Sequence, residues 1–347
     1  MNWYEPILER DLLPDTLIRR AVRHLIAGRL KEESAGSESE VDRRQQDFVA
    51  KLRQSPVAIH TVDANRQHYE VPARFFELVL GPNLKYSSCY WTAGDETLGD
   101  AETSMLELTV ARARLADGQS ILELGCGWGS LSLFMAAKYP AAQITGVSNS
   151  ASQREFILAQ ARERSLHNLN IITRDMNDFE ARATFDRIVS VEMFEHMRNY
   201  EVLLRRISTW LKPQGLLFVH IFAHRQYAYP FEVRGSGDWM AEHFFTGGIM
   251  PSAGLLSQFN ADMRVIEQWD VNGQHYQRTS EEWLLLTDRH REEILRLFAA
   301  VYGEHEALKW LVRWRVFFIA CAELFGYKDG KEWLVPHYLF AKTTDLT

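Results

Sequence analysis

Three glycines alternate at Gly125, Gly127 and Gly129, directly after an apolar run that ends in Glu123 and Leu124. A strand, a tight turn and a helix start are expected here, because glycine lets a ligand lie against bare backbone and accepts positive φ angles. The dinucleotide fingerprint is instead G-x-G-x-x-G, with an acidic residue about 20 positions further on. The pattern therefore predicts a site for S-adenosylmethionine (SAM), in which Glu123 is the polar partner of the methionyl ammonium.

Two carboxylates and an imidazole follow at Glu192, Glu195 and His196. They come at the end of a predicted buried strand, the edge of a parallel sheet at which ligands bind. Ionisable groups are costly to place there unless they take part in chemistry. The structural alternative is an acidic helix start that complements the helix dipole. Adjacent residues cannot share a helical face, but a turn could direct Glu195 and His196 into one cavity.

Polar groups that suit the adenosine of the cofactor follow the neighbouring strands. Ser148, Asn149 and Gln153 offer hydroxyl and amide groups where most adenosine-binding folds place a carboxylate for the ribose. Asp175 and Met176 suit the adenine, with a carboxylate for its exocyclic amine and an apolar surface for its ring. An ordinary loop acid remains the alternative for Asp175.

Strands alternate with helices from residue 120 onward, which predicts a doubly wound, mostly parallel α/β sheet. The expected strands are 120–124, 143–147, 169–173, 185–191, 215–221, 263–269 and 338–342. The expected helices are 130–138, 152–165, 200–211, 281–302 and 305–325, and others within residues 1–60, interrupted by a charged loop at 31–40. Lys212-Pro213-Gln214-Gly215 is a helix stop signal. An aromatic, glycine-rich insertion at 224–258 predicts a lid or pocket wall.

Length and composition narrow the class of protein. The 347 residues suit one elaborated domain or two small ones, and a net charge of −7 argues against nucleic-acid binding. Three cysteines without metal spacing predict reduced thiols and no metal. The start of the chain lacks a signal-peptide pattern, and no apolar stretch reaches the roughly 20 residues of a membrane span. We expect a cytoplasmic protein, and a homodimer is compatible with the sequence.

Several motifs together resemble the cyclopropane-fatty-acid-synthase superfamily of SAM-dependent methyltransferases. They are Tyr86-Ser87, the run Leu124 to Gly129, Gly146-Val147-Ser148, Gln153, Ser190-Val191, Met193-Phe194-Glu195-His196 and the run Leu211 to Gly215. Within the superfamily the chain is more similar to the coclaurine N-methyltransferase branch. The supporting runs are His68 to Pro72, Val191 to Met197, Phe244 to Gly248, Met250 to Ala253, Val271 to Gly273, His275-Tyr276, Thr279 to Trp283 and Ala322 to Tyr327.

The resemblance implies a Rossmann-like class I methyltransferase fold with a mostly parallel seven-stranded sheet. An N-terminal helical cap would span 1–66 and the methyltransferase domain 67–347. An insertion at about 222–262 and helices at about 281–326 would form the substrate pocket.

The resemblance also implies roles for individual residues. The cofactor-binding residues would be Tyr86, Ser87, Glu123, Gly125, Gly127, Trp128, Gly129, Ser148, Asn149, Gln153, Asp175, Met176 and Val191. Glu195 and His196 would orient and deprotonate an incoming ammonium, and Glu70 and Glu192 would favour the cation. Tyr69 and Phe244 would form part of an aromatic cradle. The substrate-binding residues would be His220, Phe222, Phe244 and Tyr276.

Two positions depart from the lipid-cyclopropanating relatives. Those relatives usually have glycine at the position of Glu192, and a cysteine that aligns with Ser88 helps them to hold a bicarbonate ion as base. Glu195, His220 and Tyr276 match the other positions of that site. A carboxylate at position 192 would repel bicarbonate and attract an ammonium. Bicarbonate is therefore not expected, and a small-molecule amine is the favoured substrate.

The implied reaction is in-line transfer of the sulfonium methyl group to an amine nitrogen, with aromatic and heterocyclic amines among the candidates. Alignment of nitrogen, methyl and sulfur would supply most of the rate, and carboxylates would stabilise the developing positive charge. The alternative is methyl transfer to an unsaturated acyl chain, as in cyclopropane-fatty-acyl-phospholipid synthases. It requires membrane contact, which amphipathic N-terminal helices could supply. A scaffold without activity is disfavoured, because the glycine loop and the acidic cluster are intact.

Overall fold

The structure is a computed structural model that describes residues 4–59, 71–235 and 237–345. Its strands are β1 (Ser120–Leu124), β2 (Gln143–Ser148), β3 (Leu169–Thr173), β4 (Phe185–Val191), β5 (Leu211–His220), β6 (Ala223–His224), β7 (Tyr229–Pro230), β8 (Ile249–Met250), β9 (Met263–Val271) and β10 (Trp333–Lys342). Its helices of more than four residues are α2 (Asp15–Glu33), α3 (Glu38–Gln54), α5 (Ala73–Val79), α6 (Leu98–Arg112), α7 (Ser130–Lys138), α8 (Ala151–Glu163), α9 (Tyr200–Trp210), α10 (Trp239–His243), α11 (Gln274–Arg289), α12 (Arg291–Tyr302) and α13 (Glu304–Gly326).

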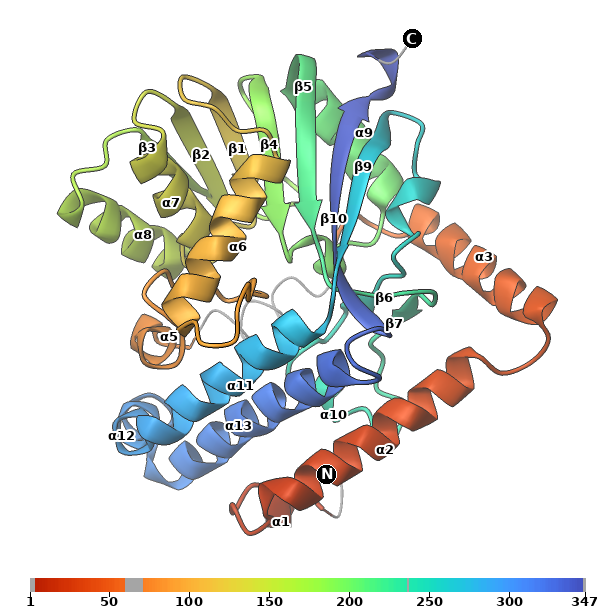
Figure 1. The fold of residues 1–347 in the computed structure, drawn as a ribbon, viewed down its shortest axis with the longest axis vertical. Helices are drawn as coiled ribbons and strands as arrows, with labels where there is room; N and C mark the ends of the chain where they lie inside the picture. Colours follow the sequence, from red (N-terminus) through yellow and green to blue (C-terminus); the bar gives the residue numbers. More distant parts are fainter. Residues whose placement is uncertain (1–3, 60–70, 236, 346–347) are drawn as a thin grey trace.

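The main sheet has the order β3-β2-β1-β4-β5-β10, and both β9 and β6 pair with β10 (Figure 1). β3 to β5 form a parallel ladder, whereas β10 runs antiparallel to both β5 and β9. In Figure 1, α6 lies in front of the strands and α9 behind them. The predicted mostly parallel, seven-stranded sheet is confirmed, and the two-residue β6 adds an eighth strand. The carboxyl ends of β1 to β5 point towards a lower layer of helices.

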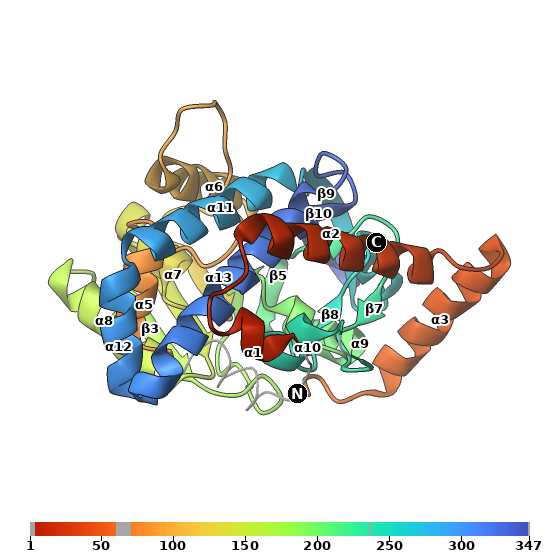
Figure 2. The ribbon, with the colours of Figure 1, turned by 90° about the horizontal axis from the view of Figure 1, so that it is seen from below.

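That lower layer corrects one predicted element. The single helix expected over 281–302 is wrong, because α11 ends at Arg289 and α12 begins at Arg291. His290 takes φ −98° and ψ 17° between them. The turn lets α12 pack against α13 and α5 instead of continuing the axis of α11 (Figure 2). Tertiary packing thus decides a break that neither glycine nor proline marks in the sequence.

Other boundaries also differ from the expectation: α11 begins at Gln274 rather than at residue 281, and β10 begins at Trp333 rather than at residue 338. α2 extends to Glu33, so the predicted loop at 31–40 shrinks to 34–37, and Ser37 begins α3 with a capping box. β5 begins at Leu211 rather than at residue 215. Its pairing with β4 jumps from Leu211 to Leu216, and Gln214 takes a φ of 59°. The turn predicted at Lys212 to Gly215 is present, but it forms a bulge near the start of β5.

The N-terminal helices attach to the lower layer largely through ion pairs. α2 lies along α13, and Arg315 of α13 holds Asp15 at 3.0 Å and Asp288 of α11 at 2.6 Å. Arg19 of α2 lies 2.6 Å from Glu281 of α11. The proposed boundary between a cap (1–66) and a methyltransferase domain (67–347) falls outside the described residues and stays a prediction.

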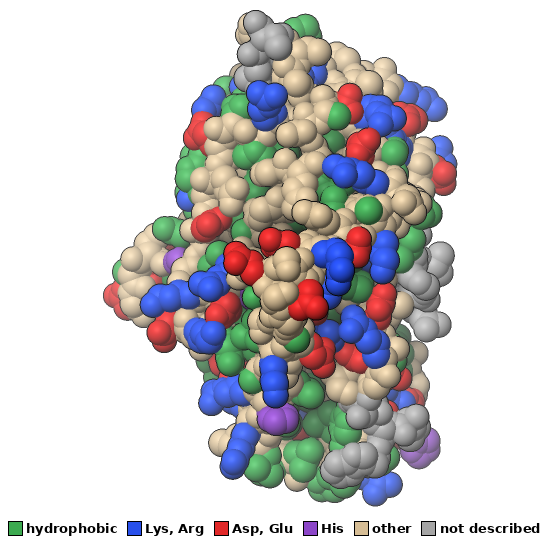
Figure 3. All heavy atoms as spheres, turned by 90° about the vertical axis from the view of Figure 1, so that its right-hand side faces the viewer, with side chains coloured by type: hydrophobic (Ala, Val, Ile, Leu, Met, Phe, Trp, Pro, Cys, Tyr) green, Lys and Arg blue, Asp and Glu red, His purple; other side chains and the backbone are tan. Residues whose placement is uncertain are grey.

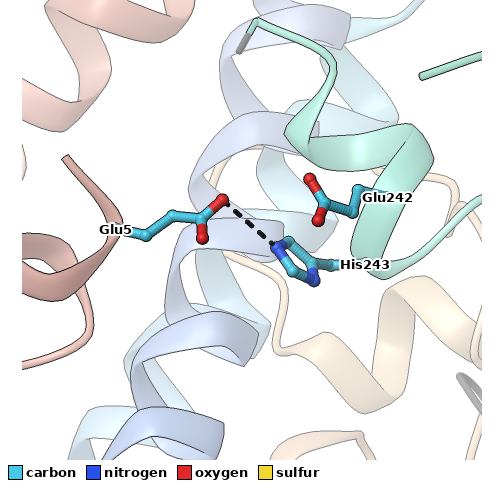
Figure 4. A group of neighbouring side chains, drawn as sticks. All are labelled: Glu5, Glu242 and His243. Atoms are coloured by element: carbon cyan, nitrogen blue, oxygen red, sulfur yellow. Dashed lines mark ion pairs between the residues drawn. The ribbon is translucent and has the colours of Figure 1, made fainter. Parts of the chain in front are cut away.

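The insertion after β5 contains β6, β7, α10 and β8, with β7 and β8 paired as a two-stranded sheet. Aromatic rings link it internally, as in Phe231 and Phe245 at 4.9 Å. The short helix α1 (Glu5–Leu8) reaches the insertion at α10, where His243 Nε2 lies 3.8 Å from a carboxylate oxygen of Glu5 (Figure 4). The insertion is therefore packed against the N-terminal helices.

Within the described ranges, no helix combines the length and the apolar character that crossing a membrane requires. On the face shown in Figure 3, Lys and Arg side chains are interspersed with Asp and Glu side chains. Because positive and negative side chains are interspersed there, this face has no electrostatic potential of a single sign.

Candidate functional site

One cavity at the carboxyl ends of the parallel strands brings most of the predicted site together. Its wall includes every predicted cofactor residue except Gly129: Tyr86, Ser87, Glu123, Gly125, Gly127, Trp128, Ser148, Asn149, Gln153, Asp175, Met176 and Val191. Glu192 and His196 line the same cavity. The predicted cofactor groups and part of the predicted acid–imidazole cluster therefore share one space.

The glycine loop is built as the sequence predicts. Gly125 and Gly129 take φ angles of 82° and 84°, a region that side-chain-bearing residues rarely adopt. A Cβ atom at Gly125 would lie 2.7 Å from the side chain of Met193, and one at Gly129 would lie 2.7 Å from Ile157. Gly129 stands at the N-cap of α7 and shapes the turn without lining the cavity. The loop leaves its backbone open to a ligand, as the glycine-rich loop of a SAM site requires.

Glu123 lies at the end of β1 with only 2% of its surface exposed. The Ser132 hydroxyl donates a hydrogen bond to one carboxylate oxygen. Burial raises the pKa of Glu123 to about 7, although the Ser132 hydrogen bond acts in the opposite direction. A buried acid that lines the cavity and has no cationic neighbour among the described residues is suited to a ligand ammonium.

The groups predicted for the ribose lie after β2. The Ser148 hydroxyl donates to Gln153 Oε1 at 2.7 Å, and Ser150 is the N-cap of α8. Gln153 is 1% exposed, and its Nε2 has no hydrogen-bond partner among the described residues. This buried donor is available to a ligand hydroxyl. Asp175 accepts the backbone N–H of Asn177 with one oxygen and lines the cavity beside Met176.

Glu192 follows β4 with a backbone conformation that few side chains adopt. Its φ is 47°, in the left-handed region, which costs about 1–2 kcal/mol for a residue other than glycine. Its N–H donates to the His220 carbonyl at 2.8 Å, which holds the turn in place. Backbone strain of this kind persists where the side chain has a role, so the strain supports a functional Glu192.

Three groups surround the Glu192 carboxylate. The Ser88 N–H donates to Oε1 at 3.0 Å, His220 Nε2 lies 3.3 Å from the same oxygen, and the Tyr276 hydroxyl donates to Oε2 at 2.7 Å. Burial raises the pKa of Glu192, whereas the charge of Lys85 and the hydrogen bonds from Ser88 and Tyr276 lower it. The net direction is upward, and these contacts make the shift smaller than burial alone would.

Glu195 lies one layer behind the cavity wall. Its side chain is fully buried, Oε1 accepts the Phe222 N–H at 2.7 Å, and Oε2 has no hydrogen-bond partner among the described residues. Burial first, and then the charge of Glu192, raise the pKa of Glu195 well above its ordinary value. The pKa is raised for both acids, and more strongly for Glu195, so Glu195 is the member of the pair that more readily keeps a proton.

His196 belongs to a short 3₁₀ turn, η1 (Phe194–His196), and lines the cavity. Its ring stacks on Phe245 at 4.8 Å, and Phe245 also contacts Phe222 at 5.4 Å. The turn thus separates the two adjacent side chains: His196 faces the cavity and Glu195 the interior. Sequence analysis singled out Phe244 and missed Phe245, although the two are neighbours in one aromatic run.

The predicted substrate residues take different positions. His220 and Tyr276 reach the site through Glu192, while Phe222 acts through its backbone on Glu195. Phe244 is 1% exposed and stacks on Phe317 at 4.4 Å. Among the described residues, the cavity wall includes none of these four. Tyr69 and Glu70 lie outside the described residues.

Lys85 is a site residue that sequence analysis did not assign. It is 3% exposed, and its Nζ donates to the Ser87 hydroxyl and, at 2.8 Å, to the Ser88 carbonyl. Burial lowers the pKa of Lys85, while the negative charges of neighbouring acids oppose that effect. Lys85 thereby shapes the loop whose Ser88 N–H reaches Glu192. The sequence signal that could have identified Lys85 is its position next to Tyr86 and Ser87, which were predicted to bind the cofactor.

A second group of ligating side chains lies away from the cavity. Candidate ligand atoms of Glu5, Glu242 and His243 lie within 4.8 Å of one another (Figure 4). Burial lowers the pKa of His243, so the ion pair between His243 and Glu5 weakens near neutral pH. The group links α1 to α10 and shares no residue with the cavity wall. The expectation that the protein needs no metal stays a prediction.

Comparison with known proteins identifies the family. Residues 58–331 match the mycolic acid cyclopropane synthetase family. The chain is 40% identical over 339 residues to (S)-coclaurine N-methyltransferase of Thalictrum flavum subsp. glaucum, an alignment that covers 96% of this chain and 94% of that protein. Cyclopropane-fatty-acyl-phospholipid synthase of Escherichia coli (strain K12) is more distant, at 28% identity over 280 residues, 78% of this chain and 66% of that protein.

A crystal structure points to the same branch. Coclaurine N-methyltransferase bound to N-methylheliamine and S-adenosylhomocysteine matches with a TM-score of 0.94 and 39% identity, covering 97% of this chain and 98% of that one. The predicted fold, the use of SAM and the resemblance to the coclaurine branch are thereby confirmed. The chain belongs to the mycolic acid cyclopropane synthetase family and is a SAM-dependent N-methyltransferase of its coclaurine N-methyltransferase-like branch.

Proposed function

We propose that this methyltransferase methylates the ring nitrogen of a benzylisoquinoline or a related heterocyclic amine. Relatives at 40% and 38% identity are coclaurine N-methyltransferases, and the matching crystal structure contains an N-methylated amine. The observation that carries the proposal is Glu192, a strained and hydrogen-bonded carboxylate at the mouth of the cofactor cavity. A negative charge there attracts a protonated amine and disfavours an anion.

The chemistry assigns different tasks to the residues of the cavity. SAM, when bound, supplies a methyl group on a sulfonium sulfur. A protonated amine has no free lone pair, so His196 removes its proton, a task for which imidazole is suited near neutral pH. Glu192 then stabilises the positive charge that develops on nitrogen as the methyl group arrives. Glu123 and Gln153 hold the ends of the cofactor and fix the approach of the amine.

Glu195 has a supporting place in this proposal. Because burial and the charge of Glu192 favour its protonated form, it does not add a second negative charge to the cavity. It holds the Phe222 backbone and the turn that carries His196. Glu195 therefore orients the base from behind.

The contacts of Glu192 also support the proposal that bicarbonate has no role here. In the lipid-modifying relatives, residues that correspond to Ser88, His220 and Tyr276 belong to the bicarbonate site. In this chain the Ser88 N–H, His220 Nε2 and the Tyr276 hydroxyl surround the Glu192 carboxylate itself. The side chain occupies the donors that a small anion would need.

Methyl transfer from isotopically labelled SAM tests the proposed substrate class. The purified chain is offered coclaurine, simple alkylamines and vesicles of unsaturated phospholipid in separate reactions. Label on the nitrogen of coclaurine, at a rate well above that of the alkylamines, supports the proposal. Label in the acyl chains of the vesicles, with none in the amines, contradicts it and favours the lipid alternative.

Alanine variants test the proposed base. His196→Ala should lower turnover by about 10²-fold or more, because general-base assistance is worth about that much, and Glu195→Ala should also lower turnover because it removes the group that orients His196. The affinity for SAM, measured by calorimetry, should change little. Near-full turnover in both variants would remove His196 and Glu195 from the mechanism.

Two expectations about the molecule's surroundings remain part of the proposal. A cytoplasmic location is supported by three cysteines that are all buried and free. A homodimer is a further prediction, to be checked by light scattering on the purified chain.

A further inference from the structure

A row of three side chains connects the half-buried end of α6 to Glu192 through the sheet. Arg112 Nη1 lies 2.8 Å from His337 Nδ1, and the His337 ring stacks on His220 with centroids 4.5 Å apart. His220 Nε2 in turn lies 3.3 Å from Glu192 Oε1. His337 and His220 are direct cross-strand partners on β10 and β5. The register of the sheet therefore sets this stack.

Hydrogen-bond chemistry fixes where the protons are on these rings. An arginine guanidinium only donates, so His337 Nδ1 accepts and the His337 proton is on Nε2. His220 Nε2 faces a carboxylate, so its proton is on Nε2 as well. Neither His337 Nε2 nor His220 Nδ1 has a hydrogen-bond partner among the described residues. These contacts favour the tautomer with the proton on Nε2 in both rings.

Burial, assisted by the positive charges around the stack, keeps both rings neutral. Burial lowers the pKa of His220 well below its ordinary value, and the positive charges of Lys85 and Arg112 act in the same direction. Burial also lowers the pKa of His337, helped by His220, Arg112 and Lys85. Of the charged groups in the described part of the chain that act on the stack, Glu192 is the negative one. If the positive charge of Arg112 were removed, a protonated His220 would be less strongly disfavoured and would form an ion pair with Glu192.

We propose that Arg112 and His337 are positioning residues that keep His220 a neutral hydrogen-bond donor to Glu192. A protonated His220 would form an ion pair with Glu192 and cancel the negative charge that the cavity offers to an amine. The neutral ring instead donates a hydrogen bond and leaves that charge in place. Arg112 also lies over the Trp269 ring at 5.0 Å, which holds the guanidinium against β9. The consequence for catalysis rests on the proposed amine methylation, whereas the charge state of the histidines does not.

Histidine NMR tests the charge state without any amine substrate. In the full chain with ¹⁵N-labelled histidines, His220 and His337 should remain neutral from about pH 5.5 upward. Arg112→Met should bring the titration of His220 into that range, while Arg112→Lys should keep the wild-type behaviour because it retains the charge. Resonances are assigned with His220→Gln and His337→Gln. If both rings stay neutral in Arg112→Met, the proposal is overturned.

Kinetics then tests the link to Glu192, with coclaurine as the probe. In Arg112→Met, kcat/KM near pH 6 should fall by about threefold to tenfold and should match wild type above about pH 8. Arg112→Lys should restore the profile. A merely structural role, through packing on Trp269, would lower the melting temperature and leave the pH profile unchanged. An unchanged pH profile would contradict the proposal, whether it comes with a lower melting temperature or with a His220 that titrates. Arg112→Gln serves as a second variant if Arg112→Met folds poorly.

Discussion

At the scale of single residues, Glu192 combines two costs that are difficult to explain without function. Its backbone is in the left-handed region at φ 47°, and its carboxylate is held in a largely buried position. Glycine would remove both costs at this position. The three hydrogen-bonding neighbours of the carboxylate indicate that the fold is arranged to keep it.

Substitution of Glu192 by glycine and by alanine separates backbone strain from side-chain chemistry. Both variants lose the carboxylate, but only glycine adopts the positive φ freely. Glu192→Gly should therefore be more stable than Glu192→Ala by about 1 kcal/mol, as measured by urea unfolding. Equal stability of the two variants would mean that the turn relaxes and stores no strain.

The raised pKa of Glu123 predicts that SAM affinity depends on pH. The ligand ammonium favours the ionised carboxylate, but in the free protein burial raises its pKa to about 7. Binding below that pH must expel a proton, so affinity should rise with pH up to about 7 and then level off, by up to about tenfold per pH unit on the acid side. Calorimetry with SAM in buffers of different ionisation enthalpy measures the affinity and the released proton together.

Glu123→Gln is the matched control for this pH dependence. It retains the size and the hydrogen bond of the side chain and removes the titration. The variant should bind more weakly with a flatter profile, and any slope that remains belongs to the cofactor itself. An unchanged slope in Glu123→Gln would assign the titration to another group.

At the scale of elements, the site exists because four strands end at the same edge. β1 supplies Glu123, β2 ends at Ser148 and is followed by Asn149 to Gln153, β3 is followed by Asp175, and β4 by Glu192. Short loops at these ends carry the polar groups, while the strands behind them are buried. This arrangement follows from the parallel connections and explains why a sequence pattern can locate the cavity.

Local patterns predicted what depends on local structure. The bounds of the strands at 120–124, 169–173 and 185–191 agree with β1, β3 and β4, because each is a short apolar run with clear ends. Glu192 and His196 were found for the same reason, at the end of such a run. The break at His290 was missed, because the periodicity continues across it and only the packing of α12 requires it.

Contacts between distant segments could not be predicted in this way. Arg112 and His337 are 225 positions apart and meet only because β10 inserts between β5 and β9. Glu195 and His196 are neighbours in the sequence, yet the 3₁₀ turn directs the Glu195 side chain to the interior. Backbone geometry of this kind is invisible in composition and spacing.

The ion pairs between α2 and the lower layer predict a localised loss of stability. Arg315 is 10% exposed and binds Asp15 and Asp288, so Arg315→Met leaves two carboxylates without their cation. The free energy of unfolding should fall by about 2–3 kcal/mol. Arg20→Met on the exposed face of α2 is the control and should stay within about 0.5 kcal/mol of wild type. Equal effects of the two substitutions would contradict a specific role for the Arg315 pairs.

At the scale of the whole molecule, the cavity lies at the carboxyl ends of the parallel strands, and its wall comes from the strand ends, the loops that follow them, α6 and the segment from Leu84 to Ser87. The N-terminal helices pack on the outside of the lower layer, where α2 lies along α13. The net charge of −7 is compatible with a cationic substrate, and mixed charges cover the face of Figure 3. Family membership, fold and cavity thus agree on one activity.

The central claim is that the Glu192 carboxylate makes this cavity a site for amines. The most direct measurement is methyl transfer to coclaurine by Glu192→Gly, with and without added formate. We predict a loss of kcat/KM of about 10²-fold, because one preorganised electrostatic contact is worth that much, and partial recovery when formate occupies the donors of Ser88, His220 and Tyr276. Wild-type rates in Glu192→Gly, with no response to formate, would contradict the account.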